Sequence, residues 1–415
     1  MQCKTSLTTP GCLADGDHPD SADLLTHVLY FFTIRLITRT AISIALAAAL
    51  PVLSAQALGR RKRAVTDEEV ARVHKSALLI DTHNDVTGAT VAGLDLGKPN
   101  TDHMTDIPRM KKGGMAAQFF AVYVAASYVE GNHSANRALQ MIDTVRHDII
   151  DRHPNDLVLA ATAADIRRAH QQGKIAALLG IEGGHAIEDS VRLLRDYFDL
   201  GVRYMTLTHT NSNHWADSSG DTNHPNNGLS PLGREIVGEM NRLGMIVDIS
   251  HVSDKTFWDA LEISKAPIFA SHSSCRAISP APRNLTDEMI SALAKKRGVV
   301  QINFYCDFLN PEVFHANEAA AAKKQGRTTQ RATLADVVKH INHVVQIAGI
   351  DAVGLGSDFD GIECAPEGLD SVDKWPNLTR ALLEEGYTAE EIRKIYGENT
   401  LRLMSEVEAV ARSMR

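Results

Sequence analysis

The chain has 415 residues and a formal net charge of −8, with 44% hydrophobic and 23% charged residues. This composition is typical of a globular protein, and the length is sufficient for a large hydrophobic core. The mild acidity and the single short basic block, GRRKR at residues 59–63, argue against nucleic acid as a partner.

The first 57 residues carry the pattern of an N-terminal extension followed by a secretory signal peptide. Arg35 and Arg39 precede an apolar run that ends in the small residues Ala55-Gln56-Ala57. An uncleaved membrane anchor is the alternative, but the small residues favour cleavage after Ala57. We therefore expect residues 58–415 to form a single exported domain, periplasmic or secreted, that has no stable membrane anchor.

Three cysteines, Cys275, Cys306 and Cys364, follow the expected cleavage site, and their spacing is not that of a zinc finger. Because three is an odd number, at most one disulfide can form among them within a chain. The sequence does not indicate which pair would form it.

After residue 66, short β-rich runs alternate with amphipathic helical segments. The expected strands are residues 77–85, 115–124, 174–184, 204–209, 244–251, 267–274, 298–305 and 352–361. Eight strands that alternate with helices predict an α/β fold, a (β/α)₈ TIM-type barrel with long loops at its C-terminal face. A doubly wound open sheet is the competitor, but the first strand is not followed by a Gly-rich phosphate loop.

Polar residues recur at the ends of six of these strands: His83, Asp85, Glu182, His209, His251, His272 and Asp358. In a barrel such residues lie at the C-terminal rim, where barrel enzymes build their active sites. Histidine and carboxylate without thiolate suit Zn²⁺ or another divalent first-row ion. The set exceeds what one tetrahedral ion needs, so two metals bridged by a carboxylate and a hydroxide fit better and predict hydrolysis.

The chain resembles the renal (membrane) dipeptidases, within the metal-dependent hydrolase barrels related to the amidohydrolases. The resemblance runs from about residue 68 to about residue 404. It rests on the motifs DTHND, GIEGGHAI, LTHTNSNHWADS, GLSPLGREIVGEMNRLGMIVDISHVS, ASHSSCRAISPAPRN, VQINFY, GLGSDFDG and GENTLRLM. Mammalian members carry a GPI anchor, which is directed by a hydrophobic C-terminal tail. This sequence shows no such tail, so it looks like an exported bacterial member.

The resemblance implies a dipeptidase with two zinc ions per chain. His83, Asp85 and a bridging Glu182 would hold one ion, and Glu182, His251 and His272 would hold the other. The expected substrates are dipeptides, including those with a C-terminal D-residue. A homodimer is also implied.

Four further roles follow from the resemblance. His209 would bind the substrate carbonyl as it becomes tetrahedral, and Arg283 would grip the C-terminal carboxylate of the dipeptide. Asp358 would take a proton from the attacking water and return it to the leaving amine, and Tyr305 would line the pocket.

Two other functions stay open at this point. One is a related barrel hydrolase that acts on N-acyl amino acids, cyclic amides or β-lactams. The other is a catalytically silent metal-binding protein on the same fold. His209 and Asp358, which a metal cage does not require, favour an enzyme.

Overall fold

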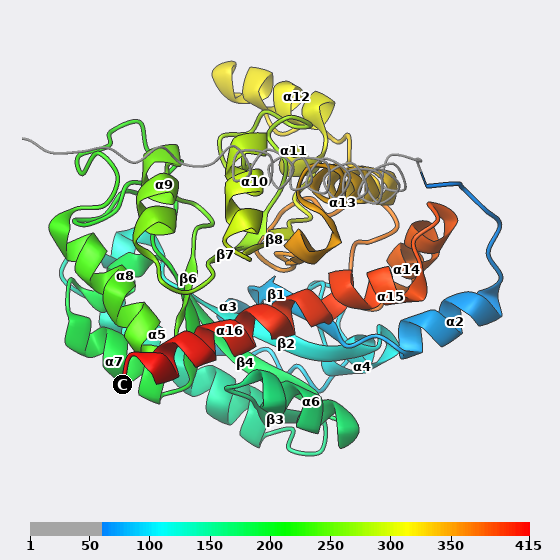
Figure 1. Ribbon diagram of the computed structural model, residues 1–415, viewed down its shortest axis with the longest axis horizontal. Coiled ribbons are helices and arrows are strands. Elements are labelled where there is room, and N and C mark those ends of the chain that lie inside the picture. Colours follow the sequence, from blue (N-terminus) through cyan, green and yellow to red (C-terminus); the bar gives the residue numbers. More distant parts are fainter. Residues whose placement is uncertain (1–59) are drawn as a thin grey trace, which may run out of the picture. The chain divides into compact units, whose positions relative to one another are not determined.

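The computed structural model describes residues 60–415, and the compact unit Lys62–Arg415 contains the whole barrel (Figure 1). The expected signal peptide lies outside the described residues. Within residues 60–415, no helix combines the length and the apolar character needed to cross a membrane.

Eight parallel strands form the barrel in the order β1-β2-β4-β5-β6-β7-β8-β9. Their bounds are β1 Leu79–Asn84, β2 Met115–Tyr123, β4 Ile175–Glu182, β5 Val202–Thr206, β6 Ile246–Asp248, β7 Phe269–Ser273, β8 Val299–Ile302 and β9 Val353–Leu355. A parallel bridge between Asn84 and Phe359 joins the first strand to the segment after the last, so the ring is nearly closed. All eight expected strands are present, and the predicted barrel is confirmed.

One strand was not expected. β3 (Leu157–Leu159) pairs in parallel with β4 and lies outside the ring of eight. A run of three residues, one buried and two half-buried, is too short to show a strand period in the sequence. Pairing with the start of β4 is enough to form the strand.

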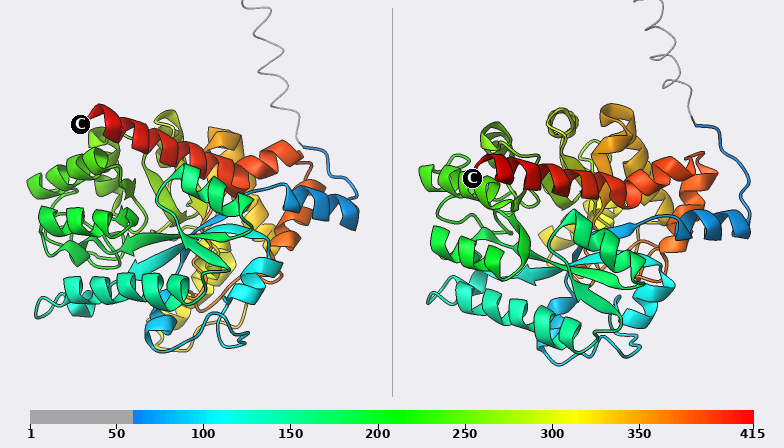
Figure 2. Two further views of the ribbon diagram at one scale, coloured as in Figure 1. Left: turned by 90° about the horizontal axis from the view of Figure 1, so that it is seen from below. Right: turned by 60° about the horizontal axis from the view of Figure 1, so that its bottom comes forward.

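Helices follow most of the strands and surround the barrel (Figure 2). Their bounds are α2 Asp67–Lys75, α3 Val86–Val91, α4 Ile107–Lys112, α5 Ser134–Thr144, α6 Ala163–Gln171, α7 Val191–Asp199, α8 Pro231–Leu243, α9 Asp254–Ile263, α10 Asp287–Lys295, α11 Cys306–Leu309, α12 Pro311–Ala322, α13 Leu334–Ala348, α14 Trp375–Glu384, α15 Ala389–Arg393 and α16 Asn399–Ser413. Helix α8 shows why such segments fold. The Ser230 side chain caps its first turn, Pro231 follows at a position that needs no N–H, and Gly244 ends it at a φ of 91°.

The interior of the barrel is filled at the end where the strands begin. Ile246, Phe269 and Val299, the first residues of β6, β7 and β8, share one apolar cluster with Leu403 and Val407 of α16. Helix α16 therefore closes this end, and the ends of the strands that carry the polar residues stay open for a site.

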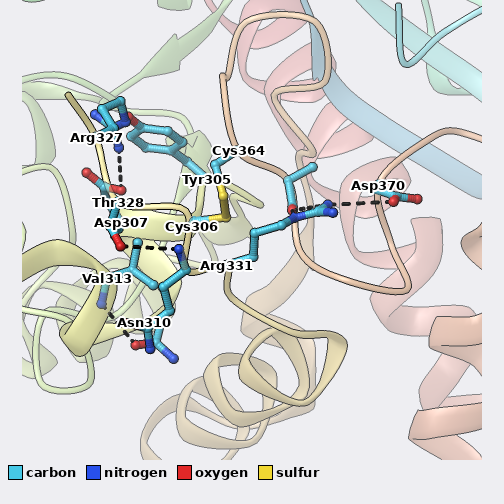
Figure 3. Close-up of a disulfide and its surroundings, with 12 residues drawn as sticks. Tyr305, Cys306, Asp307, Asn310, Val313, Arg327, Thr328, Arg331, Cys364 and Asp370 are labelled. Carbon is cyan, nitrogen blue, oxygen red and sulfur yellow. Dashed lines mark hydrogen bonds and ion pairs between the residues drawn. A yellow bond between two sulfur atoms is a disulfide. The ribbon is translucent and has the colours of Figure 1, made fainter. Parts of the chain in front are cut away.

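A disulfide joins Cys306 and Cys364, and Cys275 is buried and free. Cys306 begins α11 directly after β8, and Cys364 lies in the long segment that follows β9 (Figure 3). The bond thus ties together two loops at the open end of the barrel. This pairing answers the question that the sequence left open.

We expect the double variant Cys306→Ser/Cys364→Ser to unfold more easily than the wild type. The bond closes a loop across a sequence separation of 58 residues, and constraining such a loop stabilises a folded chain by about 2–4 kcal/mol. Denaturant titrations with and without reductant measure the effect. Reductant should lower the midpoint of the wild type and leave that of the double variant unchanged; equal midpoints for oxidised and reduced wild type would contradict the prediction.

Candidate active site

The seven polar residues expected at the strand ends do meet at the open end of the barrel. Glu182 ends β4, and its two carboxylate oxygens face different histidines. Oε2 lies 3.5 Å from Nε2 of His83, whereas Oε1 lies 2.9 Å from Nε2 of His251 and 3.3 Å from Nε2 of His272. One carboxylate therefore stands between two groups of nitrogen ligands.

Hydrogen bonds fix the orientation of the His83 imidazole so that the lone pair of Nε2 faces Glu182. Nδ1 lies 2.7 Å from the hydroxyl of Tyr204, and that hydroxyl donates to the carbonyl of Thr82 at 3.1 Å. The hydroxyl must therefore accept a hydrogen bond from the Nδ1–H group, which leaves Nε2 unprotonated in the neutral ring. Nε2 is buried, has no hydrogen-bond partner among residues 60–415, and lies 3.2 Å from Oδ2 of Asp85.

The imidazole of His272 is also oriented by a hydrogen bond of its Nδ1, here with residues of β6 and β7. Nδ1 lies 2.7 Å from Oγ of Ser271, which donates to a carboxylate oxygen of Asp248 at 2.6 Å. Nδ1 is thus the protonated nitrogen, and Nε2 carries the lone pair. Nε2 lies only 3.0 Å from Nε2 of His251. Outer hydrogen bonds of this kind are typical of histidines that bind metals.

Three groups of three ligand atoms result among the described residues, and two of them include Glu182: one with His83 and Asp85, the other with His251 and His272. The third group joins His83 and His272 to Asp358. In each group all the ligand atoms lie within 4.8 Å of one another. A buried imidazole nitrogen without a partner, surrounded by carboxylates, fits a cation at that point, and nitrogen and oxygen ligands without thiolate fit zinc. The donor set therefore fits the two ions that the sequence predicted.

The electrostatics favour the forms that bind metals. Burial, with the cation of Arg283 nearby, holds the pKa of His251 and His272 well below the ordinary value, so both rings are neutral. Burial alone would raise the pKa of Glu182, but the neighbouring His83 and the other histidines outweigh it and keep this pKa well below its usual range. Neutral imidazoles and an ionised carboxylate are the ligating states.

His83 shows the complementary effect. Burial lowers its pKa, but Tyr204 and the carboxylates of Glu182 and Asp85 outweigh burial and raise the pKa well above the ordinary value. The carboxylates thus favour a positive charge beside Nε2, which a proton can supply and which a divalent ion would supply more strongly.

Asp358 lies beside this cluster in the loop after β9. Its backbone has a φ of 64°, its N–H donates to the carbonyl of His83 at 3.0 Å, and Nδ2 of Asn303 donates to its Oδ2 at 2.8 Å. A positive φ in a residue other than glycine is strained, so these contacts hold the carboxyl in place. Burial, with the negative charges of Asp85 and Glu182 nearby, raises its pKa well above the ordinary value.

Arg283 reaches the cluster from the loop after β7. It donates to Oγ of Ser273 at 2.8 Å and to the carbonyl of His272 at 3.1 Å, and its guanidinium lies 5.6 Å from the ring centre of Phe308. Burial lowers its pKa to about 10, so it remains a cation at neutral pH. Its Nε has no partner among the described residues.

His209 follows β5, and Tyr305 follows β8. Nε2 of His209 lies 3.8 Å from Oε1 of Glu182, and its ring lies 4.7 Å from that of Tyr123. The guanidinium of Arg327 lies 5.2 Å from the ring centre of Tyr305 (Figure 3). The ring of Phe308 also packs against Tyr305, at a centroid distance of 5.0 Å. His209 and Tyr305 both line the cavity above the metal ligands.

The polar cluster forms the floor of a cavity of about 600 Å³. Of the expected site residues it exposes Asp85, Glu182, His209, His251, Arg283, Tyr305 and Asp358, whereas His83 and His272 lie beneath its surface. The volume is that of a small-molecule site.

Several supporting residues were missed by the sequence analysis. Tyr204 and Ser271, which orient His83 and His272, lie inside strands, and no spacing in the sequence distinguishes them from core residues. Asp248 could have been found, because a carboxylate within the apolar run GMIVDISH needs a buried partner. Tyr123 ends β2, but an aromatic residue there is typical of the core, and Arg137 lies on a helix face that gave no signal.

Comparisons with known proteins agree with this geometry. The family profile of the membrane dipeptidases (peptidase family M19) matches residues 67–415. A dipeptidase of Aspergillus oryzae is 39% identical over 365 residues, which cover 82% of this chain and 83% of the relative. An uncharacterised dipeptidase of Schizosaccharomyces pombe is 36% identical over 373 residues, 85% of this chain and 86% of its own.

Solved structures agree as well. A metallopeptidase of Rhodobacter sphaeroides, bound to a phosphinate mimic of the dipeptide L-Ala-D-Ala, has a TM-score of 0.71 and 28% identity over 80% of this chain and 99% of its own. A probable dipeptidase of Pseudomonas aeruginosa has a TM-score of 0.74 over 83% of this chain and 98% of its own, and at 23% identity it supports the fold alone. Both structures are bacterial and both sequence relatives are fungal, so the bacterial origin expected above stays a prediction.

The family match spans most of the described chain, from the first residue of α2 to Arg415. The metal-ligand groups found in the barrel are those that a metallopeptidase needs. The chain belongs to the membrane dipeptidase family, peptidase family M19, and is a hydrolase of the metallopeptidase class.

Proposed function

We propose that the protein hydrolyses the peptide bond of dipeptides at a site that holds two zinc ions. The observation that carries the proposal is the position of Glu182, whose Oε2 faces His83 while its Oε1 faces His251 and His272. A carboxylate placed in this way can bridge two ions, with Asp85 completing the first group. When bound, such a pair activates the attacking water and polarises the scissile carbonyl.

The residues of the chain would then divide the remaining work. His209 donates a hydrogen bond to the carbonyl oxygen as negative charge develops there. Asp358 accepts the proton of the water and delivers it to the leaving amine. Arg283 binds the C-terminal carboxylate of the substrate, with Tyr305 forming part of the wall beside it. The L-Ala-D-Ala mimic bound to the Rhodobacter relative supports substrates with a C-terminal D-residue.

A dipeptide panel tests the proposal. Protein stripped of metal by a chelator should hydrolyse none of the dipeptides, and addition of Zn²⁺ should restore hydrolysis as about two ions bind per chain. N-acyl amino acids, cyclic amides and β-lactams belong in the same panel. Faster hydrolysis of these compounds than of any dipeptide would favour the alternative that the sequence left open.

Arg283 provides the second test. If it reads the C-terminal carboxylate, the wild type should prefer a dipeptide acid over its amide by roughly 10- to 150-fold in kcat/KM, since charge-assisted hydrogen bonds contribute about 1.5–3 kcal/mol. Arg283→Ala should lose most of this preference. Arg283→Lys should recover only part of it, because an ammonium lacks the planar two-point geometry. Equal kcat/KM for acid and amide in the wild type would remove Arg283 from substrate recognition.

We also propose that the mature protein is exported after removal of residues 1–57. A disulfide between Cys306 and Cys364 supports this, because such bonds persist mainly in oxidising compartments. N-terminal sequencing of protein secreted by its native host should begin at Leu58; a full-length N-terminus would contradict cleavage. The homodimer implied by the family resemblance is part of this proposal, and sedimentation of the purified protein tests it.

A further inference from the structure

The cavity contains a second arginine that the proposed reaction does not use. Arg137 lies on α5, is half-buried, and lines the cavity. Its guanidinium lies 5.7 Å from the ring centre of Tyr128. No carboxylate of residues 60–415 lies within ion-pair distance of it, whereas Arg109 and Arg276, for example, each pair with an aspartate. Arg137 thus presents an unneutralised cation to the cavity.

Arg137 belongs to the wall of the cavity formed by α3 and α5. Asp85 immediately precedes α3, and Gly88 and Ala89 of that helix line the cavity together with Met141 of α5. Arg137 and Met141 are four residues apart and therefore share one face of their helix. We call this wall, made by Gly88, Ala89, Arg137 and Met141, the α3–α5 wall.

The α3–α5 wall and Arg283 lie on different sides of the metal ligands. Arg283 is bound to β7 through Ser273 and the His272 carbonyl, and packs against Phe308 beyond β8. The α3–α5 wall instead adjoins Asp85 at the end of β1, and α3 packs against α5 and β2. A dipeptide with its carboxylate on Arg283 and its scissile carbonyl above Glu182 therefore directs its N-terminal residue toward the α3–α5 wall.

There is room at this wall for a side chain. A Cβ atom added to Gly88 would meet no atom within 4 Å, although the position lies inside a helix with an ordinary backbone. Ala89 is also small, and the almost fully buried Met141 gives the wall an apolar edge. A side chain that crosses this space reaches a guanidinium, which prefers a carboxylate as its ligand.

Resting on the proposed function, we infer that Arg137 selects dipeptides whose N-terminal residue carries a carboxylate side chain, glutamate or aspartate. The carboxylate of such a side chain forms charge-assisted hydrogen bonds with Arg137, while its methylene groups lie along Met141 and the open space at Gly88. Arg137 is a specificity-determining residue in this scheme, because it contacts the substrate away from the reacting atoms.

The isosteric substrates Glu-Ala and Gln-Ala test the inference. The wild type should hydrolyse Glu-Ala with a kcat/KM about 10-fold or more above that for Gln-Ala, the size expected for a charge-assisted hydrogen bond. Arg137→Gln should bring the ratio close to one, and Arg137→Glu should favour Lys-Ala over Glu-Ala. The matched control is Arg152→Gln, which removes the same charge from an exposed arginine outside the cavity and should leave the ratio unchanged.

A second variant tests the space rather than the charge. Gly88→Leu should lower the ratio of kcat/KM for Glu-Ala to that for Gly-Ala, because the added side chain occupies the space of the N-terminal side chain. Hydrolysis of Ala-Ala with equal kcat/KM for Glu-Ala and Gln-Ala in the wild type would overturn the inference and leave the proposed function intact. If no dipeptide is hydrolysed by zinc-loaded wild type, the proposed function itself fails.

Discussion

Replacing Glu182 with glutamine should abolish nearly all hydrolysis and release at least one of the two metal ions. Both carboxylate oxygens face histidine nitrogens, at 2.9 Å from His251 and 3.5 Å from His83. Glutamine keeps the shape of the side chain but offers one neutral oxygen and an NH₂ group, which cannot ligate. Bridged metals contribute several kcal/mol to stabilising the transition state, so a loss of about 10³-fold or more in kcat is expected.

Elemental analysis and kinetics on the same protein preparation decide this prediction. Wild type should contain about two ions per chain. Glu182→Gln should contain one ion or none, and its kcat should be about 10³-fold or more below that of the wild type. Glu130→Gln, which changes an exposed glutamate outside the cavity, is the matched control for the loss of one charge. A Glu182→Gln protein that keeps full activity with a single ion would contradict the two-metal site.

The site could be predicted from the sequence to the extent that it depends on strand ends. His83, His251 and His272 each follow an apolar run, and in a parallel barrel the ends of such runs must meet. Glu182 and Asp358 also follow apolar runs, and the structure brings all five residues together. Their roles in catalysis stay predictions, because proximity alone does not assign them.

The supporting residues could not be predicted because they depend on contacts across the barrel. The hydroxyl of Tyr204 reaches His83 from β5, and Asp248 on β6 reaches His272 through Ser271 on β7. The side chains that fill a barrel come from every strand. A single sequence does not show at which level along the barrel axis each side chain lies, and so it does not show which ones touch. The choice of Cys306 and Cys364 for the disulfide likewise depends on loops whose paths only the fold defines.

Asp358→Asn should separate proton transfer from metal binding. We expect this variant to keep both ions and to lose roughly 10²–10⁴-fold in kcat, the contribution typical of a positioned general acid or base. The structure offers two reasons for this expectation. Burial beside Asp85 and Glu182 raises the pKa of Asp358, which suits a group that must both accept and release a proton. The amide of Asn303 also orients one of its oxygens, at 2.8 Å, and an asparagine oxygen can accept the same hydrogen bond.

The alternative is that Asp358 is itself a ligand, since its carboxylate also forms a group of three with His83 and His272. Oδ1 lies 4.0 Å from Nε2 of His83, a longer distance than the 3.2 Å from Asp85 to the same nitrogen, and this favours Asp85 as the ligand. Metal content distinguishes the two roles. Loss of one ion from Asp358→Asn would make Asp358 a ligand, whereas two ions with slow turnover would leave proton transfer as its role. Asp85→Asn is the matched comparison, because removing a true ligand should release metal and activity together.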